Sequence, residues 1–432
     1  MRKILTFFLL VFLLGNFSQV CGEETIMLRE TKEAPVIDGQ IEKLWGKPAI
    51  PYLITCIPNS KAGETPDNKT KVYLLYDEAY LYLAFACAEE EMEGLVTSRC
   101  KERDGSWGDD GIEIFLDPGR TKRSFYQIMI NADGIIADIK YPSPGQGNKK
   151  WDSNILVKTR KGKKGWTAEV KIPWADFAAD NDITGIWGIN LNRWEPRKRT
   201  GQSWASMIGG FHQLDKFKVV KFNLNPENYC YRLSNFTFGA LSFGDNILTA
   251  KIKNIGKKRS KVVAEIRWQI SEGKLNSRLK HYLLKPGEIK KLSLNYPLKQ
   301  KGEKGKIIFR LLNPKDKFCH LEEVKYFTIP SSLLTLKIEK VYYLSDSRSD
   351  LEVKINLGEN TRKKSLLLIT PPGAKEETFR KKIPSPSNEL TVPIDISKLG
   401  VGEHKILVEL FDIEKNLLES KEITFKCLKN PF

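Results

Sequence analysis

Apolar and polar residues alternate through most of this 432-residue chain. A repeat of two is the repeat of a β-strand that buries one face, whereas a surface helix repeats near 3.6. Turn-forming pairs such as Asp133-Gly134 separate the alternating runs. Short strands with this spacing predict antiparallel β-sandwiches. In the first half of the chain we expect strands near residues 72–76, 81–87, 112–116, 126–130, 166–172 and 187–191.

The chain is too long for one compact core, and its length alone predicts about three domains. After residues 224–228 the composition shifts toward Lys and away from Trp. Two further units then alternate in the manner of immunoglobulin-like sandwiches. The sequence therefore predicts an all-β chain with one sandwich at residues 23–227 and two immunoglobulin-like sandwiches at 228–330 and 331–432.

The N-terminus resembles an export signal. Two charges, Arg2 and Lys3, precede an apolar run at residues 4–14 that is too short to span a bilayer. We expect residues 1–22 to be a signal peptide whose removal releases Glu23, with lipid anchoring at Cys21 as the alternative. No other segment has eighteen consecutive apolar residues. The expected location is secreted, periplasmic or cell-surface, without a transmembrane segment after signal removal.

The net charge of +17 is unevenly distributed. Residues 226–432 contain 39 Lys and Arg against 24 Asp and Glu, whereas residues 1–225 contain 31 against 29. The lysines are spread through strand-like segments and do not form a basic stripe interleaved with aromatics, so a nucleic-acid partner is not expected. A solvated sheet face is the simpler interpretation. The alternative is a weak attraction of the C-terminal half to acidic glycans.

Motifs of catalysis and metal binding are missing. The chain has no phosphate-binding glycine loop, no H-E-x-x-H and no calcium-binding D-x-D-x-D-G loop. The six cysteines after Cys21 show no C-x-x-C pair, and buried single thiols are the simplest interpretation, with a Cys87–Cys100 bridge as the alternative. The histidines are dispersed, at positions 212, 281, 320 and 404. We predict no catalytic residue, no metal site and no cofactor.

One segment combines carboxylates with an aromatic ring. Trp107 lies close to Asp110 and Glu113, and the segment leads into the strand near 112–116. The apolar faces of a pyranose stack on indole, and its hydroxyls donate to carboxylates. Glu113 is out of phase with Ile112 and Ile114, so it points away from the face that they bury. It is either a ligand contact or a solvated surface residue, and Asp110 is expected to orient the Trp107 loop through backbone N–H groups or to contact the ligand.

Six segments in order resemble the family 9 carbohydrate-binding modules and their DOMON-like relatives, across about residues 30–223. The matching segments are Val36 to Gly39 with Trp45, Val72 to Asp77 with Tyr80 to Tyr82, Trp107 to Asp117, Asn131 to Gly134, Trp166 to Trp174, and Gly188 to Arg193. The resemblance implies a sandwich that holds a sugar between two aromatic rings. Trp107 occupies the first aromatic position, six residues before Glu113.

Two positions depart from the pattern of sugar-binding members. The second aromatic is a Trp in those members, whereas Phe211 stands here, six residues before Phe217. Gln127 falls where those members carry an Arg that bonds sugar hydroxyls, and Gln lacks the charge and the fork of donors. The resemblance also implies that structural calcium is possible. The ligand-binding residues predicted from it are Trp107, Asp110, Glu113, Gln127 and Phe211.

We therefore predict an exported, non-catalytic carbohydrate-binding protein that serves polysaccharide capture or degradation. One alternative is a glycoside hydrolase, or a subunit of one, that uses Glu113 and a nearby Asp. Another is a cell-surface adhesion or scaffold protein with a degenerate sugar site. A haem-binding relative is disfavoured, because residues 23–225 offer only His212 and four Met as axial ligands.

Overall fold

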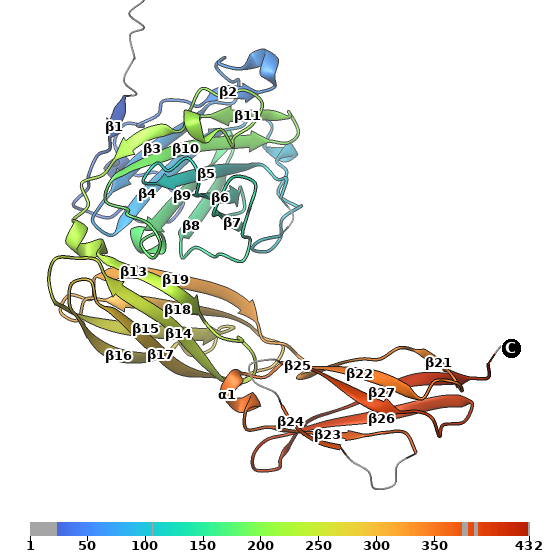
Figure 1. Ribbon diagram of the computed structural model, residues 1–432. Coiled ribbons are helices and arrows are strands. Elements are labelled where there is room, and N and C mark those ends of the chain that lie inside the picture. The colour runs from blue at the N-terminus through green and yellow to red at the C-terminus, as the bar shows by residue number, and fades with distance from the viewer. Residues whose placement is uncertain (1–23, 106, 374–378, 384–387, 431–432) are drawn as a thin grey trace, which may run out of the picture.

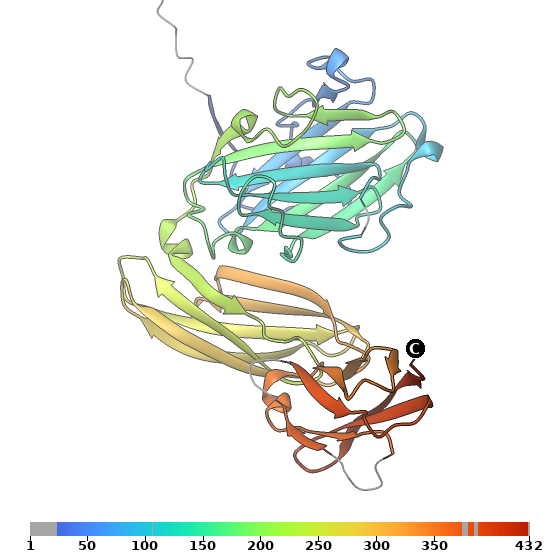
Figure 2. The same ribbon diagram turned by 45° about the vertical axis from the view of Figure 1, so that its right-hand side comes forward.

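The computed structural model describes residues 24–105, 107–373, 379–383 and 388–430, so the expected signal peptide lies outside the described residues. Three pairs of β-sheets follow one another along the chain (Figure 1). The first pair and the third lie at opposite ends of the molecule in both views (Figure 2). In the described part of the chain, no sheet combines strands from two of these three units.

The first unit contains a larger and a smaller sheet. The larger sheet has the order β1-β12-β10-β5-β6-β7, and β2 joins it through β11. Its strands are β1 (Thr25–Met27), β2 (Ile54–Ile57), β5 (Gly111–Pro118), β6 (Phe125–Asn131), β7 (Ile136–Tyr141), β10 (Ile186–Glu195), β11 (Thr200–Ser203) and β12 (Lys218–Lys221). The smaller sheet has the order β3-β4-β9-β8. Its strands are β3 (Thr70–Tyr76), β4 (Tyr80–Ala88), β8 (Leu156–Gly162) and β9 (Gly165–Pro173).

The main core lies between these two sheets. Ile112, Ile114 and Leu116 of β5 are fully buried in it, together with the matching alternate residues of the neighbouring strands. Trp166, Trp174 and Trp187 belong to the same core, as their place in the alternating pattern predicts. All six strands expected in this half of the chain are present, and the all-β prediction is confirmed.

Trp45 is buried outside the main core. It packs with Leu75 and Tyr82 on the outer face of the smaller sheet, and its indole N–H donates a 2.9 Å hydrogen bond to Glu169. The segment that carries it contains a 3-10 helix at Lys43–Trp45. Further 3-10 helices of the described chain lie at Asn59–Lys61, Met92–Gly94, Trp174–Asp176, Leu214–Lys216 and Pro226–Tyr229.

The second and third units are also two-sheet sandwiches. The second pairs the sheets β13-β14-β17 and β16-β15-β18-β19. Their bounds are β13 (Tyr231–Thr237), β14 (Gly244–Asn254), β15 (Ser260–Ile270), β16 (Asn276–Leu284), β17 (Ile289–Leu298), β18 (Lys304–Leu312) and β19 (Cys319–Thr328). The third pairs β20-β22-β25 with β21-β27-β26-β23-β24. Its elements are β20 (Leu334–Lys337), β21 (Val341–Tyr343), β22 (Arg348–Ile355), α1 (Glu359–Arg362), β23 (Leu366–Thr370), β24 (Phe379–Lys382), β25 (Glu389–Asp395), β26 (Gly402–Phe411) and β27 (Leu417–Leu428).

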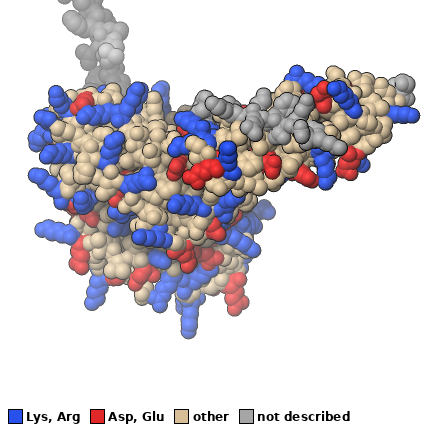
Figure 3. Space-filling model, turned by 90° about the horizontal axis from the view of Figure 1, so that it is seen from below, with Lys and Arg blue, Asp and Glu red and all other residues tan. Residues whose placement is uncertain are grey.

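The first unit contacts the second through β19. Lys325 donates a 2.5 Å hydrogen bond to Asp152, and the amide of Asn154 donates one of 2.6 Å to Glu322. Lys306 donates in turn to the side-chain oxygen of Asn154 at 2.6 Å. Seen from below, Lys and Arg are scattered over the surface with Asp and Glu between them (Figure 3). The visible face therefore agrees with dispersed charge and not with one basic stripe.

The described cysteines are free thiols at positions 56, 87, 100, 230, 319 and 427. Cys87 and Cys100 are both buried, and the structure does not contain the bridge considered between them. Burial raises the pKa of the Cys87 thiol to about 12. Among the described residues, no helix has both the length and the apolar character needed to cross a bilayer.

Candidate functional site

The outer face of the larger sheet carries the candidate site, on β5, β6 and β10. Glu113 is out of phase with the core residues of β5, so its side chain points to this outer face. Its register partner on β10 is Asn192, and directly opposed residues share a face. Phe115 lies opposite Gln127 on β6 in the same way. Three adjacent strands therefore place these side chains on one face.

A hydrogen-bonded carboxylate and amide lie at the centre of this face. Gln127 Nε2 donates a 2.7 Å hydrogen bond to Glu113 Oε2. The oxygen of the same amide accepts a 3.0 Å bond from the Tyr141 hydroxyl and lies 3.2 Å from His212 Nε2. Glu113 is only 7% exposed, so the alternative of a solvated surface glutamate is wrong. Its neighbours on the sheet exclude water from it.

The surroundings of Glu113 shift its titration. Burial raises the pKa of Glu113 to about 7, while hydrogen bonding to Gln127 and the nearby Trp107 indole N–H oppose the rise. Partial desolvation of the His212 ring lowers its pKa, which favours the neutral imidazole. Near neutral pH the face thus presents a carboxyl group that can either donate or accept a hydrogen bond.

Trp107 lies at the edge of this face, against the start of β5. A β-carbon on Gly111 would meet Trp107 Cζ2 at 3.2 Å, so the glycine allows the indole to lie close to the strand. The indole also contacts a small apolar cluster made of Met129, Ala137 and Ile139. Its Nε1 is buried and, among the described residues, has no partner that meets full hydrogen-bond geometry. The ring is half-buried, so part of it faces solvent.

A second donor beside Glu113 is also unpaired. Asn192 is fully buried, and its Nδ2 has no hydrogen-bond partner in the described chain. Its Oδ1 accepts a 2.7 Å bond from Asn190, and the Asn190 oxygen accepts from Ser203 and from the backbone of Ala205. Buried polar groups are nearly always paired. Asn192 Nδ2, which has no partner, and Trp107 Nε1, whose approach to Glu113 falls short of full hydrogen-bond geometry, therefore indicate a place where a polar ligand can bond.

Phe211 does not lie where a second aromatic ring could stack on a sugar opposite Trp107. It is 8% exposed and packs in a cluster with Phe115, Phe125 and Phe217. Its neighbour His212 is exposed and lies edge-on to Phe115, with ring centroids 5.0 Å apart. His212 and Tyr141 are thus the rings that contact Gln127, and the sequence analysis did not select either of them. The polar residue beside the expected aromatic position was the available signal for His212.

Asp110 is separated from the other predicted site residues. It is in phase with Ile112 and therefore lies on the opposite side of the sheet from Glu113. Its carboxylate accepts a 2.8 Å bond from the backbone N–H of Val96, as expected for a residue that orients this loop. Burial raises its pKa to about 6, and Arg193 opposes the rise. The structure therefore brings together Trp107, Glu113 and Gln127, with Phe211 buried nearby and Asp110 on the other face.

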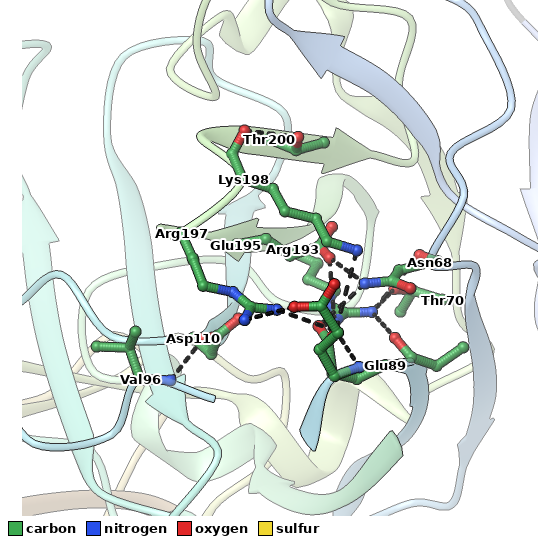
Figure 4. Close-up of polar contacts among 12 residues, drawn as sticks. Asn68, Thr70, Glu89, Val96, Asp110, Arg193, Glu195, Arg197, Lys198 and Thr200 are labelled. Carbon is green, nitrogen blue, oxygen red and sulfur yellow. Dashed lines mark hydrogen bonds and ion pairs between the residues drawn. The ribbon is translucent and has the colours of Figure 1, made fainter. Parts of the chain in front are cut away.

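Asp110 borders a buried network around Arg193 (Figure 4). The Arg193 guanidinium donates a 2.7 Å bond to the carbonyl of Ala88 and lies 3.3 and 3.4 Å from the carboxylates of Glu89 and Glu195. Asn68 donates to both of these carboxylates, at 3.0 and 2.8 Å. The network links β10 of the larger sheet to β3 and β4 of the smaller one, and its role is to hold the sandwich together.

A second carboxylate for glycoside hydrolysis is not in place. In the described part of the chain, no acidic side chain bonds to Glu113 or shifts its pKa. Asp117 shares the outer face but is four residues along β5, about 13 Å away along an extended strand. Hydrolase pairs are separated by about 5–9.5 Å. Asp117 instead accepts bonds from the backbone of Thr121 and Lys122, which closes its own turn.

One acidic cluster of the described chain has the carboxylates that calcium prefers. Oxygens of Asp104, Asp138 and Asp152 lie within 4.8 Å of one another. The guanidinium of Arg103 contacts Asp138 and lies 3.8 and 3.6 Å from the other two carboxylates. Calcium takes six to eight oxygen ligands. The cluster offers three carboxylates, and Asp138 Oδ1 and Asp152 Oδ1 are buried without a hydrogen-bond partner among the described residues. Arg103 already supplies a positive charge to the same carboxylates and would compete with calcium for them.

Comparisons with known proteins agree with the resemblance. Residues 37–208, about 40% of the chain, match the family described as carbohydrate family 9 binding domain-like. Endo-1,4-beta-xylanase A of Thermotoga maritima is 26% identical over 174 residues, and exoglucanase XynX of Acetivibrio thermocellus is 24% identical over 181 residues. These alignments cover 39% and 41% of this chain, and the chain spans only 15% of the length of each relative.

Two solved structures of a family 9 carbohydrate-binding module from Caldicellulosiruptor kristjanssonii are also similar. One is the complex with glucose and the other with cellotriose; each is 19% identical, with a TM-score of 0.34. The alignments cover 47% and 48% of this chain and 97% and 96% of the module. The first domain is a β-sandwich of two sheets, and residues 37–208 of it match the family 9 description. It is a family 9 carbohydrate-binding domain, and the family match does not extend to the rest of the chain.

Proposed function

We propose that the first sandwich binds a carbohydrate on the outer face of β5, β6 and β10. The single observation that carries the proposal is the buried Glu113–Gln127 pair, which lies between two buried donors that lack a full hydrogen bond among the described residues: Trp107 Nε1, close to the carboxylate, and Asn192 Nδ2. Hydroxyl groups of a sugar both donate and accept, so one ring can satisfy the carboxylate and these donors together. The exposed part of Trp107 provides the apolar contact.

Tyr141 and His212 complete the proposed site. Both hold the Gln127 amide, and Tyr141 also stacks on Phe125 with ring centroids 4.3 Å apart. Packing fixes their rings, so they lose little conformational freedom on binding. Phe211 supports this side of the site from below rather than by stacking on the sugar. The family 9 module of Caldicellulosiruptor kristjanssonii binds glucose in its solved complex, and a glucose-type sugar end is the first ligand to test.

The proposed role is binding without catalysis. This proposal is supported by the surroundings of Glu113, since no acidic side chain of the described residues bonds to it or shifts its pKa. Release of reducing ends from a panel of polysaccharides, abolished by Glu113→Gln, would instead establish the hydrolase alternative. The cell-surface scaffold alternative predicts protein capture that persists after glycosidase treatment of the partner.

We also propose that the chain is exported and divides at residues 227/228 and 330/331. The second and third sandwiches would then act as spacers that separate the first domain from the C-terminal end of the chain. Family 9 domains occur in the two enzymes named above, and this chain would supply polysaccharide capture beside such enzymes. Mass spectrometry of the exported protein would test the cleavage before Glu23.

The test of the binding site is titration calorimetry with cellotriose and glucose. Trp107→Ala removes the apolar platform, and we expect affinity to fall by at least about tenfold. The matched control is Tyr343→Ala, which removes an aromatic ring of 42% exposure in the third sandwich and leaves affinity unchanged. The proposal fails if cellotriose, glucose and a wider glycan array give no binding, or if both variants bind as the parent does.

A further inference from the structure

A cavity lies on the outer face of the smaller sheet. Its volume is about 510 Å³, within the range of small-molecule sites. Strands β3, β4, β8 and β9 form its floor, and the turn at Gly39 forms one side. This cavity is on the sheet opposite the one that carries Glu113. A ligand here would therefore leave the Trp107 face free.

The walls of this cavity carry only positive charge. Five of its lining residues are basic and none is Asp or Glu: Lys69, Lys71, Arg160, Lys161 and Lys164. Lys161 is paired with Asp133 at 2.5 Å. The other four make no ion pair in the described chain. Residues 1–225 are close to neutral as a whole, so this is a local concentration of charge in a domain with little net charge.

Register arranges the basic residues around a floor of small side chains. Lys71 of β3 is paired with Ala86, Ala86 with Thr167, and Thr167 with Arg160 of β8. Three strand spacings of about 4.8 Å separate the two ends of this row, about 14 Å in total. A single small inorganic anion is much shorter than this distance, so it cannot lie against the backbone at both Lys71 and Arg160. A chain with repeated negative groups can span them.

The hairpin between β8 and β9 fixes the other end of the cavity. Gly165 has a φ of +144°, and a β-carbon there would lie 2.2 Å from the carbonyl oxygen of Cys87. Only glycine permits this approach, which brings Lys164 beside β4. Lys164 is one of the two turn residues between Gly162 and Gly165, and Lys161 precedes the turn on β8, so the backbone that carries both is well defined.

The chemistry of the lining favours an acidic glycan over nucleic acid. Single-stranded nucleic acid is usually held by exposed aromatic rings on which bases stack. Trp166 is the one aromatic residue of the lining, and its ring is buried in the core at 2% exposure. The absence of an exposed ring also makes the cavity unsuited to a neutral sugar. Cations around a floor of small side chains suit carboxylate or sulfate groups on a saccharide.

We propose that this cavity binds an acidic oligosaccharide, carboxylated or sulfated, as a second site of the first domain. The proposal is independent of the Trp107 face. Binding depends on the row from Lys71 to Arg160 and on Lys164. It weakens as salt is added, because the charges are exposed and screened.

The experiment is calorimetry of the full chain with tetragalacturonic acid and with a heparin-derived tetrasaccharide, which separate carboxylate from sulfate recognition. We expect the double variant Lys71→Gln/Arg160→Gln to lose at least tenfold in affinity for the acid that binds. Lys164→Gln is expected to lose about threefold. Lys158→Gln and Lys163→Gln are matched controls, because both are exposed lysines of the same hairpin that do not line the cavity. Melting curves check that every variant is folded.

The proposal is overturned if neither acid binds, or if the controls weaken binding as much as the cavity variants do. It is also overturned if oligothymidylate binds as tightly as the saccharide, or if inorganic sulfate competes at the same ionic strength with equal potency. Trp107→Ala is expected to leave acidic binding intact while it weakens cellotriose. Failure of one site is thereby distinguished from failure of the other.

Discussion

The side-chain amide of Gln127 donates a 2.7 Å hydrogen bond to the buried carboxylate of Glu113, on a sheet face that solvent hardly reaches. An arginine at this position would stabilise the charged form of Glu113. A neutral amide does so much less, so burial still destabilises the charged carboxylate and raises its pKa. The choice of Gln127 therefore sets the protonation of Glu113 near neutral pH.

The first prediction concerns the pH dependence of sugar binding. The pKa of Glu113 is raised to about 7, so the ionised fraction rises about tenfold between pH 6 and pH 8. If the carboxylate accepts sugar hydroxyls, affinity for cellotriose rises over this interval, by up to about tenfold. Glu113→Gln gives a flat profile. Calorimetry at several pH values measures both proteins, and a flat profile in the parent contradicts the assignment.

The same shift has a consequence for stability. A carboxyl group with a raised folded pKa stabilises the protein below its unfolded pKa, and this contribution is lost as pH rises through the folded value. We therefore expect the Glu113 contribution to be present at pH 4 and lost by pH 8. The difference in unfolding free energy between parent and Glu113→Gln, followed by urea denaturation, isolates it. A difference that does not change with pH would show that Glu113 is not shifted.

A third prediction tests why Trp107 lies against β5. A β-carbon at Gly111 would approach the backbone oxygen of Ile130 to 2.8 Å and the Trp107 ring to 3.2 Å. Overpacking of this kind costs about 1–3 kcal/mol. Gly111→Ala is expected to lower the melting temperature and to shift Trp fluorescence. Gly185→Ala is the control, because a β-carbon there meets nothing within 4 Å. Equal behaviour of the two variants contradicts the packing argument.

A fourth prediction concerns the buried guanidinium of Arg193. Replacement by Leu removes the buried cation between Glu89 and Glu195 and leaves Glu89 only the exposed Arg197 and Lys198 at 3.9 Å, which costs about 3–5 kcal/mol. Arg348→Leu is the control, since that arginine is exposed and paired with exposed Asp350. Urea denaturation measures both variants. A loss below about 1 kcal/mol for Arg193→Leu would mean that the network contributes little.

The alternating pattern was sufficient for the strands, because burial of one face leaves a period of two in the sequence. It also placed Glu113 on the outer face of β5. The pattern could not show that this outer face is itself covered: Glu113 is buried by residues of β6, β7 and a distant loop, and such long-range packing has no local signature. Six strands of the first sandwich were not predicted: β7 and β8 have few apolar positions, and β1, β2, β11 and β12 are only three or four residues long.

Loop positions were the least predictable part of the site. Spacing to Phe217 selected Phe211 as the second aromatic, but spacing alone does not say which side chain of a loop turns inward. Gly201 leaves room for the Phe211 ring, since a β-carbon there would lie 3.0 Å from Phe211 Cζ. The apolar ring fills this space, and the adjacent His212 remains outside. Likewise, the basic cavity joins four strands and one hairpin, which only the sheet register brings together.

The last prediction concerns two adjacent residues: Phe211 is buried, and His212, which was not predicted as a site residue, contacts Gln127. Phe211→Ala removes a buried ring, so we expect a loss of about 3–5 kcal/mol in stability. His212→Ala removes an exposed ring that contacts Gln127, so stability should change by less than about 1 kcal/mol while cellotriose affinity falls severalfold. Urea denaturation and calorimetry on both variants separate the two effects. If Phe211 is instead the stacking ring, Phe211→Ala will abolish binding at temperatures where the variant is fully folded, and His212→Ala will bind as the parent does.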